Sequence, residues 1–263
     1  MRFSDTIRDL RVENGTVALS WIGQAGFLLK TAGGKVLVID PCLTDYVYEC
    51  THEHAGLGFK RLAPALFEPD EIPIDWFLSS HEHEDHMDMP MMPAVMQNPG
   101  VRVLCNRPSV ELMKNAGLLD ERTRLLQVGD RLDLGECVLT VTDCDHGPET
   151  PCALGFLLDF GFVKIYYSGD TALSPERLQV PMAAQPEVAL LPINGEYGNL
   201  NSFEAAKYAA MLKSRVCIPH HFFTFANHGG DPRDAIRAFP EFAPDCRLEL
   251  LTPGEIRVFG SDV

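Results

Sequence analysis

The feature that most constrains this chain is a group of histidines and aspartates that follows an apolar run. Residues 74–78 are strand-like and come after Pro73, and they lead into the spacing H-x-H-x-D-H, which supplies His81, His83, Asp85 and His86. Alternate residues of extended backbone share a face, so we expect the first two histidines to point the same way. The aspartate and the last histidine lie past the turn. This spacing predicts a metal site at the end of a buried strand, better suited to two ions than to one.

Three further candidate ligands each lie just past the end of a predicted strand. They are His146 after residues 136–142, Asp170 after residues 163–167, and His221 after residues 216–219. A sheet directs side chains at the ends of its strands toward a common edge, so we expect these residues to join the site. A carboxylate such as Asp170 can bridge two cations. His220 competes with His221, because neighbours on extended backbone face opposite ways and only one is expected to bind.

Other acidic and histidine residues have weaker claims. Asp40 ends a predicted strand before Pro41, so it can orient a metal-bound histidine, although a simple turn explains it about equally well. Residues 42–73 are irregular and are expected to form a long loop that serves as a lid or contacts substrate. His52 and His54 within that loop lack a third ligand nearby in sequence, which favours exposed surface positions.

The pattern of apolar runs and turn residues predicts two antiparallel meanders, over residues 17–40 and 125–167, with helices between and after them. Expected strands lie at residues 17–21, 26–31, 35–40, 101–105, 125–128, 131–134, 136–142, 153–160, 163–167, 188–191, 216–219, 247–251 and 255–259. Expected helices lie at residues 91–97, 109–116, 202–212 and 232–239, with Ser202 as an N-cap and Pro232 in a first turn. This order predicts an α/β fold of two packed sheets with helices outside.

Composition limits the function classes. Lys and Arg total 22 against 37 Asp and Glu, a net charge of −15 that disfavours nucleic acid and anionic membranes as partners. The eight cysteines form no C-x-x-C pair, as expected for reduced thiols. No apolar run spans a membrane, and residues 1–5 show no apolar signal region. We therefore expect one domain over residues 1–263, located in the cytoplasm.

On these residues the chain resembles the metallo-β-lactamase superfamily, whose pattern is H-x-H-x-D-H followed by a distant His, Asp and His. Within it, the chain looks most like the L-ascorbate-6-phosphate lactonase group of metal-dependent hydrolases. The segments that carry this resemblance are Trp21–Gly26, Ile39–Pro41, Lys60–Leu62, His81–Asp88, Ala94–Asn98, Tyr167–Asp170, Gly195–Tyr197 and Ile218–His221. Related hydrolases share the pattern P-x-H-x-x-T-F, which favours His221 over His220.

The resemblance implies a four-layer αββα sandwich with two divalent ions, manganese or zinc, with iron as a further option. It assigns His81, His83 and His146 to one ion. It assigns Asp85, His86 and His221 to the other, with Asp170 as the bridge. A water on such ions ionises near neutral pH and supplies the hydroxide nucleophile. Asp85 and Asp170 are therefore the expected catalytic residues, and Asp85 can take the proton released on attack.

The favoured substrate is a small anionic ester, namely a phosphorylated sugar lactone such as L-ascorbate 6-phosphate. Candidate substrate contacts are Lys60, Arg61, Asn194, Glu196, Tyr197 and His228, each of which is also compatible with a surface role. The alternatives are a phosphodiesterase acting on a cyclic nucleotide, phospholipid or RNA, and a non-enzymatic metal-binding scaffold. β-Lactam hydrolysis is disfavoured because no export signal is seen. The resemblance also indicates a homo-oligomer.

Overall fold

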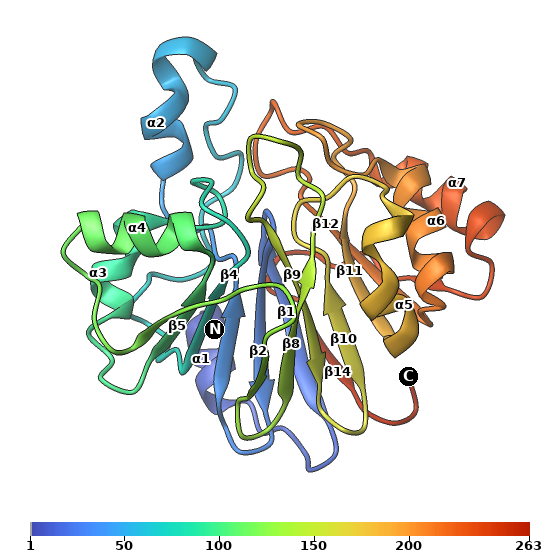
Figure 1. Cartoon of the computed structure of the whole chain (residues 1–263), viewed down its shortest axis with the longest axis horizontal. Coiled ribbons are helices and arrows are strands. Elements are labelled where there is room, and N and C mark those ends of the chain that lie inside the picture. The colour runs from blue at the N-terminus through green and yellow to red at the C-terminus, as the bar shows by residue number, and fades with distance from the viewer. Residues whose placement is uncertain (1) are drawn as a thin grey trace. The chain divides into compact units, whose positions relative to one another are not determined.

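The computed structural model describes residues 2–263, and its contacts divide the chain into two compact units. The first unit contains the described residues up to Leu126, together with Thr224–Asn227 and Thr252–Phe259. The second unit contains Gln127–Phe223, His228–Leu251 and Gly260–Val263. Each unit has its own seven-stranded sheet (Figure 1). The prediction of a single domain over residues 1–263 stays a prediction, and Met1 lies outside the described residues.

The sheet of the first unit has the strand order β14-β1-β2-β3-β4-β5-β6. Its strands are β1 (Val17–Gly23), β2 (Gly26–Thr31), β3 (Val36–Ile39), β4 (Trp76–Ser79), β5 (Arg102–Cys105), β6 (Thr123–Leu125) and β14 (Ile256–Phe259). The pairs from β14 to β3 are antiparallel, which confirms the predicted meander. The pairs from β3 to β6 are parallel. The candidate ligands therefore follow β4, the first strand after this change of direction.

The sheet of the second unit repeats the same plan, with the order β13-β12-β11-β10-β9-β8-β7. Its strands are β7 (Arg131–Asp133), β8 (Val138–Asp143), β9 (Leu154–Asp159), β10 (Lys164–Tyr167), β11 (Val188–Pro192), β12 (Val216–His220) and β13 (Arg247–Leu248). The pairs from β7 to β10 are antiparallel and those from β10 to β13 are parallel. Asp170 follows β10, the strand where pairing changes from antiparallel to parallel.

Helices accompany each sheet. The first unit has α1 (Phe3–Asp9), α2 (Tyr46–Ala55), α3 (Met92–Val95), α4 (Arg107–Asn115) and the 3₁₀ turn η1 (Met89–Met91). The second has α5 (Gln179–Ala184), α6 (Ser202–Leu212), α7 (Pro232–Phe242) and η2 (Pro175–Arg177). Across residues 2–263, no helix has the length and apolar character needed to span a membrane. The predicted mixed α/β class with two sheets is confirmed.

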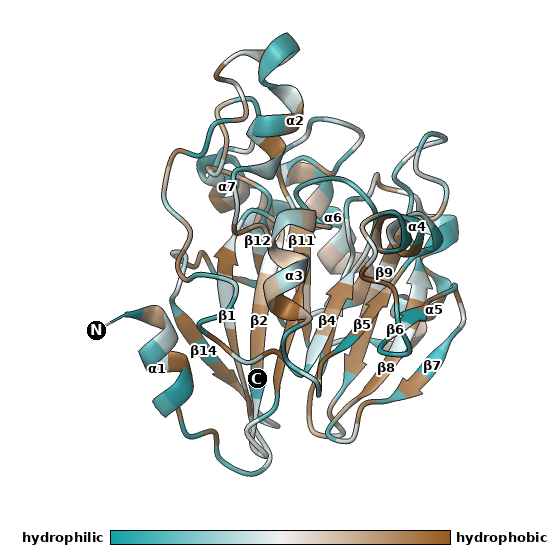
Figure 2. Cartoon of the chain, turned by 90° about the vertical axis from the view of Figure 1, so that its left-hand side faces the viewer, coloured by the Kyte–Doolittle hydropathy of each residue, from teal (hydrophilic) through white to brown (hydrophobic). Residues whose placement is uncertain are grey.

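The strands of both sheets are rich in buried apolar residues, and they are largely brown in Figure 2. In the first unit, a buried cluster combines sheet residues such as Phe77 and Val103 with Met91 and Met92 of the helical turns. Burying each such side chain contributes about 1.5–3 kcal/mol, so this core fixes the strand ends that carry the candidate ligands.

Three local predictions need correction. Residues 125–128 do not join the second meander: Leu125 ends β6, which pairs in parallel with β5 of the first sheet. The loop predicted at residues 42–73 contains α2, whose only buried residue is Val47, so the helix has no apolar stripe to detect. The N-cap of α6 is Asn201, not Ser202, because Asn201 and Glu204 form a reciprocal capping box.

The burial of the cysteines predicts which thiols react with a disulfide reagent. Six cysteines are buried, and burial raises the pKa values of the Cys144 and Cys217 thiols well above their ordinary range. Because the thiolate is the reactive form, we expect only the exposed Cys50 and the half-buried Cys152 to react promptly with a disulfide reagent at pH 8. All eight are expected to react in denaturant. Rapid modification of more than two native thiols would contradict this expectation, and Cys50→Ser identifies the faster site.

Candidate metal centre

In the first unit, the candidate ligands lie on a tight turn that begins where β4 ends. The backbone N–H groups of His86 and Met87 both donate to the carbonyl of His83, at 2.9 and 2.8 Å, which closes the turn. His81 and His86 are fully buried, Asp85 is 9% exposed and His83 is exposed. The turn therefore places four candidate metal-binding side chains within a stretch of six residues that begins two residues after β4 ends.

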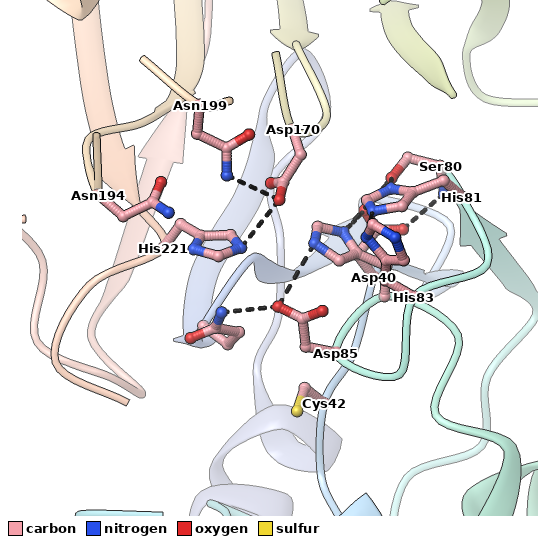
Figure 3. Close-up of polar contacts among 12 residues, drawn as sticks. Asp40, Cys42, Ser80, His81, His83, Asp85, Asp170, Asn194, Asn199 and His221 are labelled. Atoms are coloured by element: carbon pink, nitrogen blue, oxygen red, sulfur yellow. Dashed lines mark hydrogen bonds and ion pairs between the residues drawn. The ribbon is translucent and has the colours of Figure 1, made fainter. Parts of the chain in front are cut away.

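Two pairs of donor atoms approach one another on this turn, and Figure 3 shows the pair from His81 and His83. His81 Nε2 lies 3.0 Å from His83 Nδ1, and His86 Nε2 lies 3.6 Å from Asp85 Oδ2. Two nitrogen ligands of one tetrahedral zinc ion lie about 3.3 Å apart. Both separations are therefore close to those of ligands that share an ion.

Asp40 fixes which nitrogen each buried histidine offers. Its carboxylate accepts hydrogen bonds from the Ser80 backbone N–H at 2.7 Å, from the Ser80 hydroxyl, and from His86 Nδ1 at 2.7 Å. The Ser80 hydroxyl in turn accepts from His81 Nδ1 at 2.9 Å. With Nδ1 protonated on His81 and His86, each Nε2 carries the lone pair that a metal needs.

The donor atoms of Asp40, His81 and His86 also lie within 4.8 Å of one another, a grouping compatible with direct ligation by Asp40. Its carboxylate already accepts three hydrogen bonds, so an orienting role fits better than ligation. The prediction that Asp40 orients a histidine therefore agrees with the geometry.

Asp88 was not among the predicted site residues, but it connects the ligand turn to the loop after β3. Its buried carboxylate accepts from the backbone N–H groups of Leu43 and Thr44, both at 2.8 Å, and from the Thr44 hydroxyl at 2.6 Å. Burial raises the pKa of this carboxyl, while the three donors oppose that rise. The end of the turn is thus anchored to residues more than forty positions earlier in the chain.

In the second unit, His221 and Asn199 both approach one oxygen of Asp170 (Figure 3). Asp170 Oδ2 lies 3.1 Å from His221 Nε2 and 4.0 Å from His146 Nε2, and it accepts a hydrogen bond from Asn199 Nδ2 at 2.8 Å. Asp170 and His221 are 3% and 2% exposed, and His146 is also buried. The structure thus brings together all three ligands predicted for this unit.

The backbone at the end of β12 separates the two adjacent histidines. His220 is the last residue of the strand, and its ring stacks on Tyr167 with centroids 5.2 Å apart. His221 adopts a left-handed conformation with φ of 65°, and its Nε2 approaches Asp170. Of the two, His221 is the one whose ring reaches the aspartate.

Two of the predicted substrate contacts, His228 and Tyr197, form a row of rings with His221 in the second unit, with His228 in the middle. The rings of His221 and His228 have centroids 4.6 Å apart, and Tyr197 packs against His228 at 5.5 Å. Tyr197 is 56% exposed and therefore accessible. Asn194 is buried and donates to the Glu196 carbonyl at 3.2 Å, whereas the Glu196 side chain is exposed.

Arg61 and Lys60 line a cavity of about 520 Å³ within the first unit, together with Thr44, Asp45 and Glu68. Arg61 donates to the backbone carbonyls of Cys42 and Thr44, and its side chain is only 11% exposed. The structure therefore gives Arg61 partners within the protein. His52 and His54 are exposed on α2, as expected, and belong to no metal-binding group among residues 2–263.

The donor sets of both units fit a divalent metal. Imidazole nitrogen and carboxylate oxygen are the ligands that zinc, manganese and iron share. In the second unit, the 3.1 Å separation of Asp170 Oδ2 and His221 Nε2 matches that of two ligands on one ion. Each unit thus offers buried ligands suited to such an ion.

Comparisons with known proteins agree with this chemistry. A family model described as a beta-lactamase superfamily domain matches residues 18–221. A metal-dependent hydrolase of Hyperthermus butylicus is 27% identical over 241 residues, covering 91% of this chain and 98% of that protein.

Two solved structures share the fold. One is a metallo hydrolase of Ignicoccus hospitalis, with a TM-score of 0.71, 23% identity and coverage of 93% of this chain and 98% of that one. The other is an isothiocyanate hydrolase from Delia radicum gut bacteria, with a TM-score of 0.70, 20% identity and coverage of 93% and 99%.

Proposed function

The chain belongs to the beta-lactamase superfamily, and from this premise we propose that it is a metal-dependent hydrolase with two divalent ions. The observation that carries the proposal is the convergence of His146, Asn199 and His221 on one buried carboxylate oxygen of Asp170. A buried carboxylate is costly unless charge and hydrogen bonds compensate it, and a divalent ion bound by the same imidazoles supplies that charge.

The proposed ligands come from both units, and their assignment rests on the order of the motifs in the chain and on family membership. His81, His83 and His146 would hold one ion, Asp85, His86 and His221 would hold the other, and Asp170 would serve both. The distances within each unit are compatible with this assignment, since His81 pairs with His83 and Asp85 with His86 on the same turn.

When bound, the ions supply a nucleophilic water at neutral pH and a positive charge that polarises the scissile bond. The chain's own residues supply orientation and proton transfer. Asp40 and Ser80 keep the Nε2 atoms of His81 and His86 unprotonated. Asp85 is the general base in this proposal, because its carboxylate belongs to the ligand turn and can take the proton released on attack.

The proposed substrate is a small anionic ester, with a phosphorylated sugar lactone such as L-ascorbate 6-phosphate favoured. His228 supports a substrate-binding role because its ring lies against that of His221, and Tyr197 supports one because it packs against His228 and is 56% exposed. A protein with a net charge of −15 needs local donors to bind an anion, and His228 is one. Lys60 and Arg61 remain proposed contacts, although Arg61 also bonds the backbone.

The test is a parallel assay of protein reconstituted separately with manganese and zinc after metal analysis. Its substrates are L-ascorbate 6-phosphate, bis-p-nitrophenyl phosphate and an isothiocyanate, the last because a similarly folded protein is an isothiocyanate hydrolase. We expect rapid lactone opening with little diester cleavage. Preference for the diester would instead support the phosphodiesterase alternative.

Removing metal tests the dependence on it. Dialysis against a chelator is expected to abolish turnover, and adding manganese or zinc is expected to restore it. His83→Ala, which removes one exposed ligand of the turn, is expected to reduce turnover by about 10²-fold or more. His52→Ala is the control, because His52 is exposed on α2 outside every candidate group. Full activity in chelator, or bound metal without turnover of any ester, would favour the scaffold alternative.

Location and assembly complete the proposal. A cytoplasmic protein that binds neither nucleic acid nor membrane agrees with the acidic charge and the scattered cysteines. The proposed homo-oligomer rests on the family resemblance alone. Size-exclusion chromatography with light scattering tests the oligomer directly, since a monomer at micromolar concentration would contradict it.

A further inference from the structure

Each unit has a carboxamide side chain that donates a hydrogen bond to its proposed catalytic aspartate, in both cases to the Oδ2 atom. Gln24 Nε2 donates to Asp85 Oδ2 at 2.8 Å in the first unit. Asn199 Nδ2 donates to Asp170 Oδ2 at 2.8 Å in the second (Figure 3). We propose that Gln24 and Asn199 are positioning residues that fix these carboxylates for metal binding. This inference rests on the proposed function.

Gln24 occupies a strained and fully anchored position. It lies in the turn between β1 and β2 with φ of 50°, a left-handed conformation that is uncommon for residues other than glycine. Its backbone N–H donates to Thr224 Oγ1 at 2.8 Å, and its carbonyl accepts from Trp21 Nε1 at 2.9 Å. Backbone strain of this kind concentrates at functional sites, and here it directs a buried amide to Asp85.

Asn199 lies in the loop between β11 and α6, and backbone hydrogen bonds secure it on both sides. Its own N–H donates to the Glu196 carbonyl at 3.0 Å. The next residue, Leu200, donates to the Thr171 carbonyl at 2.8 Å, which ties the loop to the segment that carries Asp170. The side chain is 6% exposed, so its orientation is set by the protein.

The Asn199 amide is oriented so that its Nδ2 donates to Asp170, and among the described residues this orientation leaves its Oδ1 without a hydrogen bond. Asn199 Oδ1 is buried and accepts no hydrogen bond from residues 2–263. In the opposite orientation Oδ1 would face Asp170 Oδ2, and two acceptors in contact repel each other. The amide N–H is therefore the group that this position requires.

An amide suits this task better than a charged donor. Lysine or arginine at the same place would neutralise the carboxylate and compete with a metal for it. An amide donates one directed hydrogen bond, carries no charge, and leaves the other lone pairs of the aspartate for a cation. Gln24 and Asn199 thus fix the direction of each carboxylate and preserve its charge.

The experiment compares donor-deleting and charge-introducing variants of the full chain. Gln24→Met and Asn199→Leu remove the donor at similar size, whereas Gln24→Glu and Asn199→Asp place a second carboxylate beside the first. Zinc affinity is measured by competition with a chelator, and ligand geometry by the visible absorption of the cobalt(II)-substituted protein. We expect affinity to fall about 10–100-fold in all four variants, with a changed cobalt spectrum.

Asn98→Leu is the matched control. The Asn98 amide donates a hydrogen bond to the backbone carbonyl of Ile74 at 2.8 Å. Within residues 2–263 it donates to no candidate ligand. It is expected to change the unfolding midpoint of the metal-free protein and leave zinc affinity and the cobalt spectrum unchanged. A midpoint recorded for every metal-free variant separates misfolding from loss of ligand orientation.

The outcomes distinguish this inference from the proposed function. Suppose that the wild-type enzyme depends on metal, and that folded Gln24→Met and Asn199→Leu keep the wild-type zinc affinity and cobalt spectrum. This result would overturn the inference and leave the proposed function standing. A wild-type protein that binds neither zinc nor cobalt would overturn both. Weakened binding confined to the four variants, with Asn98→Leu unaffected, would establish the positioning role.

Discussion

Asp170→Ala is expected to lower kcat/KM for the hydrolysed substrate by about 10³-fold or more, the largest loss of activity we predict. Asp170 is the one carboxylate in the second unit that both His146 and His221 approach, and it is the proposed bridge between the ions. Metal catalysis contributes several kcal/mol of transition-state stabilisation, and each 1.36 kcal/mol corresponds to tenfold in rate. The measurement is steady-state kinetics with metal content determined in parallel.

Asp159→Ala is the control for Asp170→Ala. Asp159 ends β9 of the same sheet, and within residues 2–263 its carboxylate accepts only the Gly161 N–H, at 2.8 Å in a turn. Its removal is expected to leave kcat/KM within a factor of about two. An Asp170→Ala protein that retains both its metal and more than a tenth of wild-type activity would contradict the proposed bridging role.

Asp40→Ala is expected to lower the free energy of unfolding by about 3–5 kcal/mol, the largest stability effect we predict. The substitution leaves three buried donors without their acceptor: the Ser80 backbone N–H, the Ser80 hydroxyl and His86 Nδ1. Total stabilities are only about 5–15 kcal/mol, so much of the margin would be lost. Denaturant unfolding of the metal-free protein gives this value without interference from bound ions.

The same variant should also lose metal affinity, because the tautomers of His81 and His86 would no longer be fixed. Asp75→Ala is a useful comparison, since Asp75 also accepts from a backbone N–H, that of Val36, but its side chain is 25% exposed. It is expected to cost about 1 kcal/mol. An Asp40→Ala protein as stable as Asp75→Ala would show that the buried network contributes little.

The candidate metal ligands were predictable from the sequence because their signals are local. His81, His83, Asp85 and His86 lie within six residues after an apolar run, and the pattern of a strand followed by a turn is visible without any partner. Asp170 follows β10 by three residues for the same reason. The predicted helix at residues 202–212 has the same first and last residues as α6, because buried residues recur at helical spacing from Ser202 to Leu212.

The supporting residues were missed because their partners are distant in sequence. Gln24 meets Asp85 61 positions later, Asn199 meets Asp170 29 positions earlier, and Asp88 meets Thr44 44 positions earlier. Glutamine in a turn and asparagine in a loop are common at exposed positions, so no local pattern separates them from surface residues. Only the folded backbone shows which amide meets which carboxylate.

The placement of β14 constrains how this protein is made. β14 pairs with β1 along Val17–Ser20, so the strand at one side of the first sheet comes from residues 256–259. During translation, β1 would present an unpaired edge until more than two hundred further residues have left the ribosome. Such an edge invites pairing with other chains, and contacts of this sequence separation form slowly. A chaperone that covers the β1 edge would therefore be most useful before β14 has been synthesised.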